Sequence, residues 1–238
     1  MSSIKISLIL PCYNEGPSFE ESIKKILIVL SSLKEKWEIV FVEDFSDDGT
    51  RKKLDKISNG INNSIIIHHK RNEGRGKSVV DGIRKAKGEI CGFIDVDLEV
   101  SPSYIPLFIE TIKKGNDVAV AKRFYESGGS IARFIASKGY SAIVKFLLDL
   151  PIRDTEAGYK FFNRKKILPV IRKAKNKHWF WDTEICALAH YNGLKLTEIP
   201  VLFKRRLDKT STVKMIPDTI HFGLNLIKFK VKLLTDEK

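Results

Sequence analysis

Residues 90–99 read Ile-Cys-Gly-Phe-Ile-Asp-Val-Asp-Leu-Glu, an apolar run that ends in three acids. The uncharged part, residues 90–94, has the length and composition of a buried β-strand, and Asp95 and Asp97 follow it at once. Two carboxylates one residue apart repel each other unless a cation lies between them. Because the ligands here are oxygens only, the stretch predicts a site for a hard cation, Mg²⁺ or Mn²⁺. A loop of solvated acids is the competing interpretation.

The same pattern recurs along the first half of the chain, where short apolar runs alternate with segments of helical spacing. We expect strands at residues 4–11, 37–42, 64–68, 90–94 and 118–121, and helices at 18–35, 50–57, 77–86 and 102–112. This alternation predicts an α/β fold with a mostly parallel sheet flanked by helices. In such sheets ligands bind beyond the carboxyl ends of the strands, so the polar residues after each strand are the candidate site residues.

Polar residues also gather after the first two expected strands. They are Tyr13, Asn14 and Glu15 after the first strand, and Glu43, Asp44, Asp47 and Asp48 after the second. Helix capping explains one acid in each loop, with Asp48 or Ser46 capping a helix near Thr50. Because the other acids converge by topology on the edge that carries Asp95 and Asp97, the pattern favours a binding site over a set of caps.

The second half is less regular and ends in an amphipathic segment. We expect helices over residues 130–148, 165–175 and 182–191, and strands at 159–162 and at 194–203, the last one broken by Pro200. The simplest division is one domain over residues 1–215, with halves 1–121 and 122–215, and a helical extension over 216–238. Lys228 and Lys232 flank the apolar stripe of this extension, which predicts a helix on a membrane surface or a docking site for a membrane subunit.

Composition excludes several classes of protein. Of the 238 residues, 43% are hydrophobic, which excludes a disordered chain. The three Cys have no paired spacing, which argues against a disulfide framework or a zinc site and fits a reducing compartment. No signal peptide is visible, and no apolar run approaches the about 20 residues that a membrane-spanning helix needs. Any membrane contact is therefore expected to be peripheral.

The net charge of +13 is confined to one half of the chain. Residues 1–121 hold 18 basic and 18 acidic side chains, whereas residues 122–238 hold 24 basic and 11 acidic ones. Such an excess indicates an anionic partner, which could be nucleic acid, a membrane surface or a phosphate-bearing substrate. A solvated basic face without a specific partner is the alternative.

The motifs together resemble the family-2 glycosyltransferases, which have the GT-A (Rossmann-like) fold. The resemblance begins with Pro11-Cys12-Tyr13-Asn14-Glu15, Asp48-Gly49-Thr50, Arg71-Asn72-x-Gly74-x-Gly76 and Asp95-x-Asp97. It continues with Ala121-Lys122-Arg123-Phe124, Arg133-x-x-x-Ser137, Asp154-Thr155 and Gly158-Tyr159-Lys160-Phe161-Phe162, which are similar to the polyprenyl-phosphate (dolichyl-phosphate) mannosyl- and glucosyltransferases. It covers roughly residues 4–215.

For the donor half, residues 1–121, the resemblance implies a nucleotide-sugar site and a metal site. The implied nucleotide-sugar residues are Pro11, Tyr13, Asn14, Glu15, Asp44, Asp48, Lys77 and Asp95. The implied metal ligands are Asp95, Asp97 and Glu99, although the family usually has Gln where this chain has Glu99. A third carboxylate could strengthen metal binding or repel the diphosphate of the donor.

For the acceptor half, residues 122–215, the resemblance implies a site for a phosphate. Arg123, Arg133, Ser137 and one of Arg205 and Arg206 are the expected contacts, and guanidinium groups suit phosphate geometry. Asp154 is a possible general base or an orienting residue, and Asp182 and Glu184 are further base candidates. A phosphate monoester is already anionic at neutral pH, so the reaction needs little help from a base.

The resemblance thus implies an inverting, metal-dependent transfer of a hexose from GDP-mannose or UDP-glucose to a polyprenyl or dolichyl phosphate. Asp97, Arg123 and Arg133 are the expected catalytic residues, and the expected cofactor is Mg²⁺ or Mn²⁺. The expected location is the cytoplasmic face of a membrane, with peripheral contact and no nucleic acid. One alternative is a family-2 enzyme with a saccharide acceptor, and another is a non-catalytic protein that binds membranes or nucleic acid.

Overall fold

The computed structural model describes residues 4–125, 143–144, 146–205 and 215–236. In the first half, the elements are β1 (Ile6–Cys12), α1 (Phe19–Ser31), β2 (Trp37–Glu43), α2 (Thr50–Ser58), β3 (Ser64–His68), α3 (Arg75–Lys85), β4 (Ile90–Ile94), η1 (Pro102–Tyr104), α4 (Ile105–Lys113) and β5 (Val118–Tyr125). The second half adds β6 (Tyr159–Asn163), α6 (Arg164–Ile171), α7 (Trp181–Tyr191), β7 (Leu196–Phe203) and α8 (Met215–Asp236). Most of the helix predicted over residues 130–148 lies outside the described residues.

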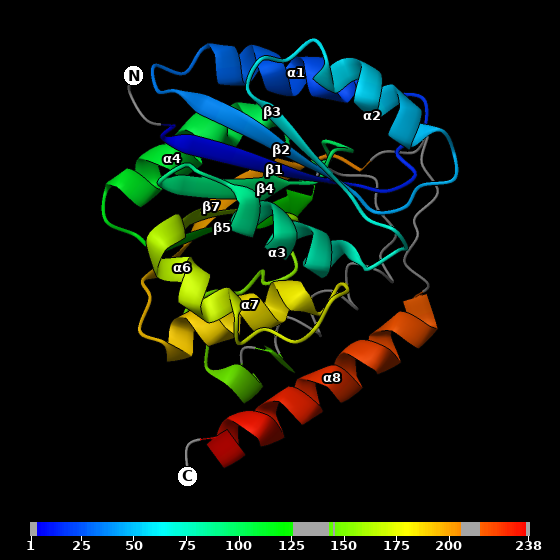
Figure 1. Cartoon of the computed structure of the whole chain (residues 1–238). Coiled ribbons are helices and arrows are strands. Elements are labelled where there is room, and N and C mark those ends of the chain that lie inside the picture. Colours follow the sequence, from blue (N-terminus) through cyan, green and yellow to red (C-terminus); the bar gives the residue numbers. More distant parts are fainter. Residues whose placement is uncertain (1–3, 126–142, 145, 206–214, 237–238) are drawn as a thin grey trace.

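The strands form one sheet in the order β3-β2-β1-β4-β6-β5-β7 (Figure 1). All neighbouring pairs are parallel except those of β6, which is antiparallel to both β4 and β5. This confirms the predicted α/β fold with a mostly parallel sheet. β7 runs through Pro200 without a break, contrary to the prediction, because β7 is the edge strand and has a neighbour on one side only.

Helices cover both faces of the sheet and bury two separate cores (Figure 1). Successive side chains of β1 and β2 point to opposite faces, so Ile9 and Val40 enter one core while Leu8 and Phe41 enter the other. The first core is closed by α3, α6 and α7, and the second by α1, α2 and α4. Both faces of each central strand are therefore buried, and its backbone can meet ligands only at its ends.

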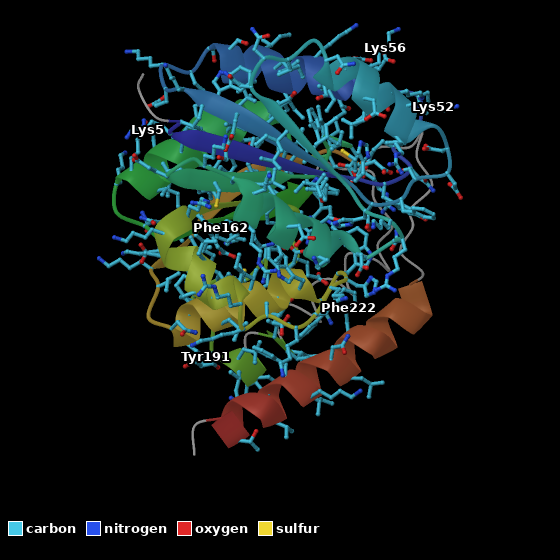
Figure 2. The ribbon with its side chains drawn as sticks, in the orientation of Figure 1. Lys5, Lys52, Lys56, Phe162, Tyr191 and Phe222 are labelled. Atoms are coloured by element: carbon cyan, nitrogen blue, oxygen red, sulfur yellow. The ribbon has the colours of Figure 1, made fainter. Side chains whose placement is uncertain are left out.

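The last helix, α8, lies against α7 at the bottom of Figure 1. Leu226 and Phe229 are buried there, and Phe222 (labelled in Figure 2) and Phe229 both contact the ring of Phe180, which precedes α7. In the parts of the chain that the structure describes, no helix combines the length and the hydropathy needed to cross a membrane.

Candidate active site

The carboxyl ends of β1, β2 and β4 bring three polar loops to one edge of the sheet. β1 and β2 pair with Cys12 opposite Glu43, and β1 and β4 pair with Ile9 opposite Phe93. The residues that follow these strands, Tyr13, Asp44 and Asp95, therefore lie at neighbouring positions along the edge. The structure thus brings together the loops in which the sequence analysis places the nucleotide-sugar and metal residues. Pro11 itself is buried within β1.

The loops after β1 and β2 are joined by hydrogen bonds between their predicted site residues. The side-chain oxygen of Asn14 accepts from the backbone N–H of Asp47 at 3.1 Å. The carboxylate of Asp48 accepts from the N–H of Gly16 at 3.1 Å and from that of Thr50 at 2.9 Å. Burial opposes the ionisation of Asp48, but these hydrogen bonds outweigh it and lower the pKa of the carboxyl. Asp48 therefore anchors one loop to the other and binds the N–H of Thr50, the first residue of α2, whose N-cap position is Gly49.

Asp44 is buried and holds the loop that precedes α3. Its carboxylate accepts from the backbone N–H of Glu73 at 2.8 Å and from that of Gly74 at 2.9 Å. The ring Nδ1 of His69 lies 2.7 Å from the same carboxylate. Most of the hydrogen-bonding capacity of Asp44 is thus used within the protein. A direct contact of Asp44 with the nucleotide stays a prediction.

Lys77, a predicted nucleotide-sugar residue, lies in the first turn of α3. Its ammonium group forms an ion pair with Asp81, one turn further along the helix. Asp81 also faces the Nε2 of His69 at 3.2 Å, so Lys77 and Asp44 are linked through two intervening side chains. The sequence favours a structural role for His69, and the structure gives its partners, Asp44 and Asp81, which no local pattern indicates.

Arg75 was absent from the predicted site, and it lies against the predicted metal ligand. Its Nε and Nη2 donate to the same oxygen of Asp95 at 2.9 and 2.7 Å, and its Nη1 pairs with Asp182 of α7. The guanidinium also lies over the rings of Phe93 and Trp179, 5.2 and 5.1 Å from their centres. Such flat, charged groups stack well on aromatic rings. Arg75 thus connects β4, α3 and α7 at the edge of the sheet.

Asp182 also binds a second buried cation, Lys160 of β6, at 2.5 Å. The ammonium group of Lys160 donates to the carbonyl oxygen of Ala157 as well, again at 2.5 Å. Because both oxygens of Asp182 are committed to cations and its side chain is buried, it is placed to organise the site and not to accept a proton from a substrate. Glu184 accepts from the backbone N–H groups of Lys175 and Asn176, so it holds a loop.

The acids after β4 suit a hard cation that a substrate also binds. Burial raises the pKa of Asp95, the charge of Asp97 raises it further, and Arg75 only partly compensates, so an additional cation would stabilise the ionised pair. No cluster of three or more His, Cys, Asp or Glu with metal-binding geometry occurs among the described residues. Mg²⁺ is commonly held by one or two carboxylates together with substrate phosphates, and Asp95 and Asp97 fit that arrangement. Glu99 as a third ligand stays a prediction.

The backbone around these acids is tightly constrained. The N–H of Asp95 donates to the carbonyl oxygen of Gly158 at 3.0 Å. A Cβ atom at position 158 would lie only 1.7 Å from Oδ2 of Asp95, so no residue with a side chain fits there without displacing the acid. Leu98, between Asp97 and Glu99, has a positive φ of 55°. Positive φ is uncommon outside glycine and often marks functional loops.

On the acceptor side, Arg123 is fixed by Asp154. Its Nε and Nη2 each donate to an oxygen of that carboxylate at 2.8 Å, and its backbone N–H donates at 3.0 Å. Burial opposes the ionisation of Asp154, but the charge and hydrogen bonds of Arg123 prevail and lower the pKa of the carboxyl. A carboxylate with a lowered pKa is a weak proton acceptor. The geometry therefore favours the orienting role over the base role for Asp154.

Glu156 lies beside Arg123 but was not among the residues predicted from the sequence. One of its oxygens lies 4.0 Å from Nη2 of Arg123. Burial raises the pKa of Glu156 to about 7, and the charges of Asp154 and Asp182 add to the rise while Arg123 opposes it. Glu156 lies in a turn just before β6, and no pattern in the sequence indicates that its side chain approaches Arg123. Near neutral pH this carboxyl is divided between its neutral and charged forms.

The remaining residues predicted to bind the acceptor are described only in part. Arg133, Ser137 and Arg206 lie outside the described residues. Arg205 is exposed just beyond β7, and together with Lys204 and Asp97 it lines a pocket of about 470 Å³. Lys25 of α1 and Ser18, the residue before α1, also line this pocket. The structure therefore brings Arg205 near Asp97.

Comparison with known proteins adds a family match and several relatives. Residues 7–169 match the family model described as Glycosyl transferase family 2. The chain is 24% identical over 233 residues to Glycosyltransferase AglD of Haloferax volcanii, which covers 95% of this chain and 37% of AglD. It is 25% identical over 239 residues to Dolichyl-phosphate beta-glucosyltransferase ALG5A of Trichomonas vaginalis, which covers 94% of this chain and 74% of the relative.

A third relative is Dolichol-phosphate mannosyltransferase of Pyrococcus furiosus, with 34% identity over 174 residues, 69% of this chain and 47% of the relative. The chain thus spans less than half the length of AglD and of the Pyrococcus protein. Among solved structures, glucosyl-3-phosphoglycerate synthase from Mycobacterium tuberculosis, in complex with Mn²⁺, UDP and phosphoglyceric acid, superposes with a TM-score of 0.71. The identity is 14% over 96% of this chain and 78% of that one. This likeness supports the predicted GT-A fold.

Proposed function

Because the chain belongs to glycosyl transferase family 2 and is a transferase, we propose that it moves a hexose from a nucleotide-diphosphate sugar to a polyprenyl or dolichyl phosphate, with inversion at the anomeric carbon. Two relatives support this acceptor by their names, since one is a dolichyl-phosphate glucosyltransferase and the other a dolichol-phosphate mannosyltransferase. The donor would accordingly be UDP-glucose or GDP-mannose. These substrates are proposals, because each relative extends beyond the part that this chain matches.

The observation that carries the proposal is a continuous charged cluster along one edge of the sheet. Asp95 of the donor side is held by Arg75, and Arg75 is held by Asp182. On the acceptor side, Nη2 of Arg123 lies 4.0 Å from Glu156, and the charge of Asp182 helps to raise the pKa of Glu156. Acids suited to a metal and a diphosphate therefore lie in the same cluster as an arginine suited to an acceptor phosphate.

In the proposed mechanism, this chain's residues bind and orient the two substrates. Asp95 and Asp97 would hold Mg²⁺ or Mn²⁺, which when bound would neutralise charge on the departing diphosphate. Asp154 fixes Arg123 through two side-chain hydrogen bonds, so the remaining N–H donors of Arg123 are held in place for the acceptor phosphate. The acceptor oxygen is already anionic, so no residue needs to remove a proton from it.

The acceptor also implies contact with a membrane surface, and α8 is suited to it. Leu224, Ile227 and Val231 are exposed on α8, although each is a large apolar side chain, and Lys228 is exposed among them. Apolar side chains beside basic ones are typical of helices that lie on anionic membranes. We therefore infer peripheral attachment at the cytoplasmic face through α8. A membrane subunit docked on α8 is the alternative. Flotation with protein-free lipid vesicles distinguishes the two, because only direct lipid binding gives flotation without that subunit.

The function is tested by a screen of nucleotide-sugar donors against dolichyl phosphate and undecaprenyl phosphate, with and without Mg²⁺ or Mn²⁺. We expect transfer to the lipid phosphate only with metal, and none to free saccharides or to dolichol without its phosphate. Transfer to a saccharide would support the alternative acceptor class and contradict this proposal. Salt-sensitive binding of duplex DNA without any transfer would support the non-catalytic alternative.

Within this assay, Asp97→Asn should lower the rate of transfer by roughly 100-fold or more, because a bound metal contributes several kcal/mol of charge stabilisation. The melting temperature should stay near that of the wild type. The control is Glu110→Gln, which changes an exposed acid on α4 that pairs with Lys113. Full activity of Asp97→Asn at limiting metal would overturn the assignment of Asp97.

A further inference from the structure

Phe45 has an unusual conformation at the edge where the donor nucleotide is proposed to bind. It follows Asp44 directly, and its φ is +66°, in the left-handed region. A bulky aromatic residue rarely adopts this region, because its Cβ crowds the neighbouring backbone. The ring is also 52% exposed, so burial of apolar surface does not account for its position.

The residues on both sides hold Phe45 in this conformation. Asp44 is fixed by the N–H groups of Glu73 and Gly74. Ser46 donates its N–H to the buried carboxylate of Glu43 at 2.5 Å, and its hydroxyl accepts from the N–H of Asn14 at 3.2 Å. Because both neighbours are anchored, the backbone at Phe45 cannot relax without breaking hydrogen bonds to buried groups. The fold thus maintains a strained residue whose ring faces outward.

A second exposed aromatic side chain lies in the neighbouring loop. Tyr13 follows β1 and is 41% exposed. Since Cys12 lies opposite Glu43 at the ends of β1 and β2, Tyr13 and Phe45 both belong to loops that leave this edge of the sheet, one and two residues beyond their strands. Two exposed aromatic residues therefore lie in adjacent loops at the same edge.

The chemistry of this edge points to a planar ligand. The carboxylate of Asp44 already accepts hydrogen bonds from the N–H groups of Glu73 and Gly74 and lies against the ring of His69. It therefore has little remaining capacity to bind the edge of a nucleobase. A nucleobase also presents two flat faces, and stacking on an aromatic side chain satisfies them without further donors or acceptors. An exposed, rigidly held ring suits this role, since little conformational freedom is lost when the ligand binds.

We propose that Phe45 is the stacking platform for the base of the donor nucleotide. This inference rests on the proposed function, because it requires a nucleotide donor. Stacking contacts every base through its flat face, so Phe45 contributes to the affinity for both uracil and guanine nucleotides. Other residues of the site distinguish uracil from guanine.

The test measures the binding of UDP, GDP and inorganic pyrophosphate to the full chain by isothermal titration calorimetry with Mg²⁺. In Phe45→Gly we expect UDP and GDP to bind about 5- to 150-fold more weakly, which is the range that the loss of one stacked base gives. Pyrophosphate, which has no base, should bind as it does to the wild type. The same variant should melt at a higher temperature, because glycine adopts positive φ without strain.

Two further variants complete the experiment. Phe45→Trp retains an aromatic ring and should keep nucleotide affinity within about twofold of the wild type. Phe124→Ala removes a ring of equal exposure, 52%, from β5, and should leave nucleotide binding unchanged. A raised melting temperature together with weakened nucleotide binding is the combination that supports the proposal.

Three results would overturn it. Unchanged affinity of Phe45→Gly for both nucleotides would remove Phe45 from the site while leaving the proposed function intact. An equal loss of pyrophosphate affinity would show that the loop acts on the diphosphate and not on the base. If the wild type bound neither UDP nor GDP, the proposed function would fail, and this inference with it.

Discussion

At the scale of single residues, Glu156 predicts how the reaction depends on pH. Its pKa of about 7 means that the carboxyl is mostly neutral below pH 7 and mostly charged above it. The charged form would compete with an acceptor phosphate for Arg123, which is 4.0 Å away. We therefore expect the KM for the acceptor to rise above pH 7, by up to about tenfold per pH unit, as for any binding step coupled to one proton.

Two variants separate this effect from the titration of the acceptor phosphate. Glu156→Gln keeps the shape of the side chain and cannot ionise, so its KM should stay flat where that of the wild type rises. Asp154→Asn loses the charge that orients Arg123, so its KM should be raised at every pH. The measurement is the KM for the lipid phosphate between pH 6 and 8.5, and a parallel rise in wild type and Glu156→Gln would exclude this role.

At the scale of elements, α7 predicts a large dependence of stability on one acid. Asp182, in the first turn of α7, pairs with Arg75 and Lys160, and all three side chains are buried or nearly so. Asp182→Ala would remove the carboxylate partner of buried Lys160 and one of the two carboxylate partners of Arg75, and breaking a buried ion pair typically costs about 3–5 kcal/mol. We expect a loss of this size in the free energy of unfolding from urea titrations. The control is Glu110→Ala, which removes the exposed partner of Lys113 and should lower the free energy of unfolding by less than about 1 kcal/mol. Equal losses in the two variants would contradict the importance of the buried pairs.

The elements also show how far the sequence predicts this molecule. The strands and helices of residues 4–121 could be predicted because apolar runs and helical spacing are local patterns. Asp95 and Asp97 were likewise predicted to follow a buried strand, and the structure has them directly after β4. The pairing of Arg75 with Asp182 could not be predicted, because 107 residues separate them and no local pattern links the two. The loop-anchoring roles of Asp44 and Asp48 were hidden for a similar reason, since their partners are backbone N–H groups of other loops.

At the scale of the whole molecule, the excess of positive charge lies in the half that carries the predicted acceptor residues and α8. The second half, which carries the entire net charge of +13, includes Arg123, Arg205 and α8. α8 packs on the residue before α7 through Phe222 and Phe229, and the first turn of α7 holds the cluster beside Asp95. The helix proposed to lie on the membrane is therefore attached to an element of the site itself.

This arrangement predicts that α8 governs lipid binding and leaves the chemistry intact. The triple change Leu224→Gln, Ile227→Gln and Val231→Gln alters only exposed side chains, so the fold should be retained. In flotation with vesicles that contain phosphatidylserine, we expect the variant to remain with the soluble fraction, since each buried apolar side chain contributes about 1.5–3 kcal/mol. Transfer to a short-chain, water-soluble prenyl phosphate should stay near the wild-type rate.

Charge should contribute separately from apolar contact. Lys228→Glu should weaken binding to the vesicles by roughly 1 kcal/mol or more and reduce the salt dependence of flotation, because a basic residue near an anionic surface contributes about that much.

The control for both kinds of variant changes Ile28 on α1 and Leu107 on α4 to Gln. These two apolar side chains are also exposed to solvent, but they lie on helices that cover the opposite face of the sheet. If this control lost flotation as fully as the α8 variants, or if the α8 variants floated like the wild type, the membrane surface would have to be sought elsewhere on the molecule.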